Sequence, residues 1–220
     1  MHHIQKYIIK TLTDTEIARF RDMRPANVDS NAYSYHLKAL QKEGYVEKAP
    51  KGYRLSPRGL AHVDKVSLDD FEERSQPKTM IILVLRDAAG RILLHEKRRQ
   101  PFIGSKLLPS GKMHLDDVSL ASAAQRELRE RVGAARIELH HAGDVFIRSS
   151  IKSELISSYT GYVFTGVLTG SEPIVHNNSW EAVDSLAVHR LAPATKEIFL
   201  LTSEPSPFFF HELHIDWEHA

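Results

Sequence analysis

Four positions in the middle of the sequence carry oxygens that could bind a cation together. Asp117 lies six residues after Gly111, and Glu127 and Glu130 follow in the run RELRERVG. Glu127 and Glu130 are three residues apart, so on a helix their carboxylates share one face. The backbone carbonyl of Gly111 is expected beside them. Such a row of oxygens is suited to a hard divalent cation.

The elements that must position these residues alternate between strands and helices. The apolar run at 80–85 predicts a buried strand, and a turn at 87–90 leads to a second strand at 91–99. A loop rich in Gly, Pro and Ser precedes a helix over 119–132, which Gly133 ends. Further strands are expected at 144–147, 158–168 and 180–186, a last helix at 193–202, and a strand-like tail that could pair with another chain.

This pattern resembles the Nudix family, whose box reads G-x5-E-x7-R-E-U-x-E-E-x-G-U, where U is a bulky aliphatic residue. Residues 111–134 follow the box through the glycine, the acidic residue and the REL-x-E-x-x-G run. The resemblance implies an α/β/α sandwich. It also implies that Gly111, Asp117, Glu127 and Glu130 hold Mg²⁺ or Mn²⁺, with Glu127 and Glu130 as the catalytic carboxylates. In the family the metal bridges the substrate's diphosphate and helps to activate water.

Three departures from the box bear on that chemistry. Arg131 stands where the family has the second glutamate of a pair, Asp117 is shorter than glutamate, and one extra residue, for which Val118 is the candidate, precedes the helix. An arginine cannot coordinate Mg²⁺ and repels it. Arg131 could pair with Glu127 four residues earlier, or it could bind phosphate directly together with Lys112.

Other acidic and histidine residues offer weaker candidates. Where many relatives have a loop glutamate, this sequence reads HNNS, and Glu154, Glu172 and Glu181 are possible substitutes. The 13 histidines are scattered without metal-ligand spacing, so most are expected on the surface. Only His114, in the box loop, is a candidate worth testing.

The first third of the chain predicts a small helical module with a strand hairpin. Asp29 or Ser30 is expected to cap its longest helix, which ends at Gly44, and Ser56 to cap the last helix, with Pro57 in its first position. The predicted elements are helices at 4–12, 13–23, 29–44 and 56–66, with strands at 45–48 and 52–55.

This order resembles the winged helix-turn-helix of bacterial repressors. The resemblance implies that the helix at 29–44 lies in the major groove of double-stranded DNA while the hairpin contacts phosphates. The candidate DNA contacts are Asn31, Ser34, Tyr35, His36, Lys38, Lys48, Lys51 and Arg54. The alternative is that the module only mediates dimerisation or docks on the rest of the chain.

Composition and charge agree with two globular domains. Residues 1–66 hold 12 Lys and Arg against 7 Asp and Glu, whereas the remainder holds 17 against 21. The absence of cysteine excludes disulfides and thiolate chemistry, and no apolar run is long enough to span a membrane. The first ten residues lack a secretory signal, so we expect a cytoplasmic protein.

We therefore expect an α+β, two-domain protein with a winged helix at 1–66, a linker at 67–78 and a Nudix domain at 79–220. The favoured function is a transcriptional regulator whose altered Nudix domain binds a nucleotide or nucleotide sugar. We expect it to be a homodimer. The alternative is a Mg²⁺-dependent pyrophosphohydrolase of nucleoside diphosphate derivatives.

Overall fold

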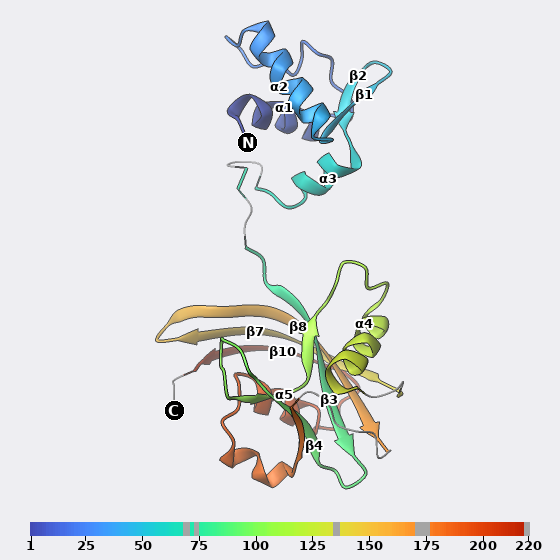
Figure 1. The fold of residues 1–220 in the computed structure, drawn as a ribbon, viewed down its shortest axis with the longest axis vertical. Coiled ribbons are helices and arrows are strands. Elements are labelled where there is room, and N and C mark those ends of the chain that lie inside the picture. The colour runs from blue at the N-terminus through green and yellow to red at the C-terminus, as the bar shows by residue number, and fades with distance from the viewer. Residues whose placement is uncertain (68–70, 73–74, 134–136, 170–176, 218–220) are drawn as a thin grey trace. The chain divides into compact units, whose positions relative to one another are not determined.

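The computed structural model describes residues 1–67, 71–72, 75–133, 137–169 and 177–217. The chain divides into two compact units, Met1–Ser75 and Gln76–Ala220, coloured blue to cyan and green to red in Figure 1. The division lies inside the segment that the sequence predicts as a linker, and Phe71 from that segment packs against the core of the first unit. No helix within the described residues is long and apolar enough to cross a membrane.

The first unit packs its helices around a core that includes Ile8, Ile9, Tyr33, Leu37 and Leu40. The apolar residues recur at helical spacing, so each helix turns one stripe inward. The elements are α1 (His3–Thr13), α2 (Ser30–Lys42), β1 (Val46–Ala49), β2 (Gly52–Leu55) and α3 (Pro57–Val63). This order fits a winged helix, with α2 as the longest helix and the antiparallel β1–β2 hairpin as the wing.

Helix capping in the first unit follows the sequence closely, but one predicted helix does not form. The side chain of Asp29 accepts hydrogen bonds at the start of α2, and that of Ser56 accepts one at the start of α3. The prediction of a helix at 13–23 was wrong, because α1 ends at Thr13 and residues 14–23 form no helix. Ala18 instead exchanges two backbone hydrogen bonds with Tyr53 of β2. This pairing with the wing satisfies backbone groups that a helix would have used.

The second unit is built on a mixed sheet of eight strands among the described residues. The sheet runs β10–β7–β8–β3–β4–β5, with β6 also paired to β3 and β9 to β4. The strands are β3 (Lys78–Asp87), β4 (Ile92–Glu96), β5 (Lys106–Leu107), β6 (Ser110–Lys112), β7 (His140–Ile151), β8 (Glu154–Leu168), β9 (Asn178–Glu181) and β10 (Phe209–Asp216).

Alternate residues of β3 pack against two different helical layers. Ile81 and Leu83 belong to a core shared with the helix α4 (Leu120–Glu127), whereas Ile82 and Val84 belong to one shared with α5 (Thr195–Leu201). Both faces of the strand are therefore buried, which explains its continuous apolar run. The result is the predicted α/β/α sandwich, with α4 and α5 on opposite faces of the sheet (Figure 1).

Two segments near the C-terminus differ from the sequence prediction. The stretch predicted as one strand at 180–186 is divided between β9 and a 3-10 helix, η2 (Val183–Val188). The tail forms β10 as predicted, but it pairs in parallel with β7 of its own chain. The edge of β10 that pairs with β7 is therefore not available to another chain, so the hypothesis of pairing with another chain is wrong for that edge.

Candidate functional site

The helix that carries the box changes its winding within the box. Ser119 caps the start of α4, and the helix continues from Leu128 as a π-helix, η1 (Leu128–Val132), which Gly133 closes with a φ of 76°. The wider π turn follows directly after Glu127. Glu127 is accordingly buried at 1% exposure, whereas the side chain of Glu130 is 53% exposed, so the two carboxylates share less of a face than their spacing predicts.

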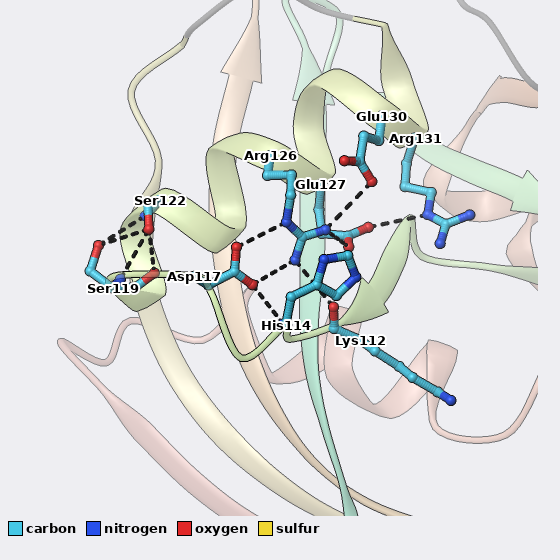
Figure 2. Close-up of polar contacts among 9 residues, drawn as sticks. All are labelled: Lys112, His114, Asp117, Ser119, Ser122, Arg126, Glu127, Glu130 and Arg131. Carbon is cyan, nitrogen blue, oxygen red and sulfur yellow. Dashed lines mark hydrogen bonds and ion pairs between the residues drawn. The ribbon is translucent and has the colours of Figure 1, made fainter.

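Arg126 lies at the centre of the carboxylates, as Figure 2 shows. Its Nε and Nη2 donate to the two oxygens of Asp117 at 2.9 and 2.7 Å, and its Nη1 donates to Glu127 at 2.6 Å. The same Nη1 lies 3.5 Å from Glu130, and Nη2 donates to the carbonyl of Lys112 at 3.2 Å. One guanidinium thus contacts all three carboxylates of the box.

The bidentate contact with Arg126 fixes the ionisation of Asp117. Hydrogen bonds from Arg126 and from the backbone N–H of His114 hold the pKa of Asp117 well below its usual range, and Asp117 in turn raises the pKa of Arg126. Val118, the candidate for the extra residue, is 92% exposed in the loop. The loop therefore accommodates it while Asp117 still reaches Arg126.

Glu127 is held between two arginines and a glycine. Its Oε1 accepts from Arg126, and its Oε2 accepts from Nε of Arg131 at 3.1 Å. A Cβ atom on Gly111 would lie 2.1 to 2.2 Å from the Glu127 carboxylate. Of the two roles that the sequence leaves open for Arg131, the ion pair with Glu127 is therefore formed in this structure.

The predicted metal ligands do not fit a divalent cation in this arrangement. Both oxygens of Asp117 and both oxygens of Glu127 accept hydrogen bonds from guanidinium groups. Across the described segments, no group of three or more His, Asp or Glu side chains is arranged to hold a metal ion. A cation would have to displace two arginines, so the cost of breaking these ion pairs opposes metal binding.

A cavity of about 790 Å³ opens beside this network, within the size range of small-molecule sites. Its floor includes Met80, Ile82 and Ile198, which places it on the α5 side of the sheet. Gly111 and His114 of the box loop also line it. The basic side chains in its wall are Lys78, Lys97, Arg98, Arg99, Lys112 and Arg131. No carboxylate lines it among the described residues, so its walls favour an anion.

Two of the substitutes considered for the missing glutamate, Glu154 and Glu181, do not line this cavity. Glu154 is exposed at the start of β8, and Glu172 lies outside the described residues. Glu181 pairs with Lys106 and with His189. Burial would raise the pKa of Glu181, but hydrogen bonds from Lys106, Ser179 and His189 outweigh this and lower it to about 2.

Sequence reasoning missed Arg126 and Asn178. The position of Arg126 directly before Glu127 was visible, but its contacts depend on how the loop at Asp117 folds back. Asn178 donates from Nδ2 to the carbonyl of Arg131 at 2.7 Å, and its Oδ1 lies 3.1 Å from Nδ1 of His95, which lines the cavity. Asn178 thereby links β9 to the end of the box helix. The HNNS stretch gave the only sequence signal for it.

In the first unit, most candidate DNA contacts are exposed on α2 and the wing. Those that are exposed are Asn31, Tyr35, Lys38, Lys48, Lys51 and Arg54. Ser34 is partly buried, and the ring of His36 stacks on His2 at 4.0 Å. Arg54 donates to Glu47 at 2.7 Å, whereas Lys48 and Lys51 of the wing form no ion pair among the described residues.

Comparisons with known proteins address the fold of the second unit. A family model described as NUDIX domain matches residues 76–201. The NUDIX domain of Shewanella oneidensis NrtR, solved as a complex with ADP ribose, is 15% identical, with a TM-score of 0.50 over 66% of this chain and 96% of that chain. A MutT protein from Bacillus halodurans is 19% identical, with a TM-score of 0.50 over 63% and 90%.

At these identities, the two solved structures show a shared fold. The search of curated proteins found no match. The family model, by contrast, covers more than half of the 220 residues and includes both the sheet and the box helix. The chain therefore belongs to the NUDIX family.

Proposed function

We propose that this protein is a DNA-binding transcriptional regulator whose NUDIX domain binds a nucleotide or nucleotide sugar without hydrolysing it. The observation that carries the proposal is the cavity wall, which holds six Lys and Arg side chains and no carboxylate among the described residues. Lys112 and Arg131 are the proposed contacts to the ligand's diphosphate. A guanidinium and an ammonium recognise phosphate oxygens directly, so this binding needs no divalent cation.

The box favours binding over hydrolysis because its carboxylates are already engaged. Glu127 is almost fully buried, and each of its oxygens accepts from an arginine. Because both of its oxygens are engaged by guanidinium groups, this carboxylate is not free to coordinate a cation. The roles of Glu127 and Glu130 as catalytic and metal-binding residues, and of Mg²⁺ as cofactor, thus remain predictions that the site chemistry disfavours.

The binding test is isothermal titration calorimetry with ADP-ribose, first in EDTA and then in Mg²⁺. ADP-ribose is the first probe because it is the ligand in the NrtR structure of the same fold. We expect binding in EDTA that Arg131→Glu weakens at least tenfold. The matched control is Arg129→Glu, an exposed position two residues earlier that does not line the cavity, and it should bind as the wild type does. Binding that requires Mg²⁺ would overturn the metal-free mode.

Hydrolysis is tested separately by mass spectrometry with a panel of ADP-ribose, dinucleotides, nucleotide sugars and nucleoside triphosphates. We expect no product with Mg²⁺ or Mn²⁺. Turnover that Glu127→Gln abolishes would instead establish the pyrophosphohydrolase, with Glu127 as a residue of its reaction.

For the DNA-binding role, the support is the exposed face of α2, the wing and the positive charge of residues 1–66. The test is a gel shift with genomic fragments, with and without the ligand. We expect Lys51→Glu to weaken binding and to reduce the slope of log K against log salt by about 0.9. Lys196→Glu, an exposed charge reversal in the second unit, is the control. An unchanged slope in Lys51→Glu would remove the wing from the interface.

The homodimer is also part of this proposal, and light scattering after gel filtration measures it. Two half-sites on DNA suit a protein with two-fold symmetry. A monomer at the concentrations that bind DNA would contradict it.

A further inference from the structure

The basic residues of the cavity wall fall into two groups with different origins. Lys112 and Arg131 come from the box, and we call them the box group. Lys97, Arg98 and Arg99 lie on the loop after β4, and together with Lys78 at the start of β3 they form the loop group. The box group is adjacent to the carboxylate network, whereas the loop group is outside the box altogether.

The loop that carries Lys97 is fixed by contacts at both ends. The N–H of Lys97 donates to the carbonyl of Ser105 at 2.9 Å, and the N–H of Gly104 donates to the carbonyl of Lys97 at 2.7 Å. The Lys97 ammonium lies 5.7 Å from the ring centre of Phe102, which meets Trp217 edge-on at 4.7 Å. Lys97 is therefore held at the cavity wall rather than free in solvent.

The cations of the loop group have no anionic partner within the described residues. None of its four members forms an ion pair there, whereas Arg131 of the box group pairs with Glu127. Burial lowers the pKa of Lys97, and the charge of Lys78 lowers it further. Two neighbouring ammonium groups that repel each other without a counter-charge are stabilised by an anion placed between them.

The two groups together hold more positive charges than a diphosphate can neutralise. A diphosphate that links two sugars carries two negative charges, and the proposed function assigns them to the two cations of the box group. The four cations of the loop group are then left over. Lys78 lies two residues from Met80, the residue that pairs with Lys112 across the sheet, so both groups face one continuous cavity.

We propose that the loop group is a second phosphate subsite, and that the ligand carries at least one phosphate beyond a diphosphate. This inference rests on the proposed function, because it assumes that the box group takes the diphosphate. The additional phosphate has two chemical sources, which are a longer phosphoanhydride chain and a phosphate monoester on a sugar. Both present an oxyanion that Lys and Arg bind directly.

The test is calorimetry in EDTA with two matched pairs of probes, on the full chain. ADP and ATP differ by one phosphate in the chain, whereas ADP-ribose and its 2′-phosphate differ by a monoester. We expect at least tenfold tighter binding of the more phosphorylated member in one pair, and that pair identifies the source. In the double variant Lys78→Met/Lys97→Met, the ratio of the two affinities within that pair should fall below threefold. The affinity for the less phosphorylated member should stay within threefold of the wild-type value.

Methionine is chosen because it keeps a long, unbranched side chain beside the Phe102 ring while it removes the charge. A thermal melt checks that the double variant is folded, and Lys196→Met, outside the cavity, is the control for loss of a surface charge. If the variant does not fold, Arg98→Gln/Arg99→Gln replaces it, since both side chains are exposed.

Each other outcome overturns the inference. Equal affinity within both pairs, or a gain that survives in the double variant, would mean that the loop group is no phosphate subsite, although the proposed function would stand. Failure of every probe to bind would overturn the proposed function as well. Weaker DNA binding by the double variant in the absence of ligand would assign the loop group to the DNA backbone.

Discussion

Gly111→Ala tests whether the Glu127 carboxylate fills the space that the box would otherwise offer to a metal. The φ of Gly111 is not positive, so alanine can adopt its backbone conformation. The difficulty is space, because the new Cβ would lie 2.1 to 2.2 Å from the carboxylate atoms of Glu127. Glu127 is 1% exposed and cannot move aside without weakening its contacts with Arg126 and Arg131.

The expected loss of stability follows from those contacts. Overpacking of a core costs about 1 to 3 kcal/mol, and displacing a buried carboxylate from an ion pair adds to it, so we expect about 3 kcal/mol. For a unit of this size, that corresponds to a fall in Tm of about 6 to 12 °C. The measurement is scanning calorimetry of the full chain at pH 7, following the transition of the second unit.

Glu127→Ala supplies the matched background, because it removes the carboxylate that the new Cβ meets. In that background Gly111→Ala should be close to neutral, so the two changes should be strongly coupled in a double-mutant cycle. A Tm within 2 °C of wild type, or an equal loss in both backgrounds, would refute the packing of Glu127 against Gly111.

Two further predictions concern the ion pairs around the site. Arg126→Gln should lower the Tm of the second unit far more than Arg129→Gln, because of these two arginines only Arg126 forms ion pairs with the box carboxylates. Similar melting of the two variants would contradict this. The pKa of Glu181 is lowered to about 2, so its contribution to stability is complete above about pH 4.5 and is lost as the pH falls toward 2. Urea unfolding between pH 5 and 3 should show this loss of stability, and the loss should be smaller in Lys106→Met, because removal of the ammonium brings the folded pKa of Glu181 back toward its unfolded value. Equal losses in the two proteins would contradict this.

The sequence alone determined the local structure around each candidate site. Asp29, Ser56 and Ser119 cap helices because a short polar side chain reaches the free N–H groups of the first turn, an interaction within three residues. The apolar run of β3 likewise predicted a buried strand, and the structure buries it on both faces. The box glycine, acidic residue and REL run then identified the family, and the fold of the second unit followed from it.

Only the tertiary structure decided what the box residues contact. Arg126 on α4 meets Asp117, which lies nine residues earlier in the loop before that helix, and Asn178 reaches Arg131 from a strand 47 residues away. Such contacts depend on how the loop and sheet pack, and helical spacing does not encode them. The same holds for Ala18, whose pairing with Tyr53 replaced the helix predicted at 13–23.

The sequence did not predict the cavity either. Its basic residues come from β3, the loop after β4, β6 and the box helix, and no local pattern joins them. They gather because β3 lies at the centre of the sheet and pairs with β4 and β6, while the box helix ends at the same edge. The sequence thus determined which residues could do chemistry. The packing of the sheet determined that six basic side chains, two of them from the box, line one cavity.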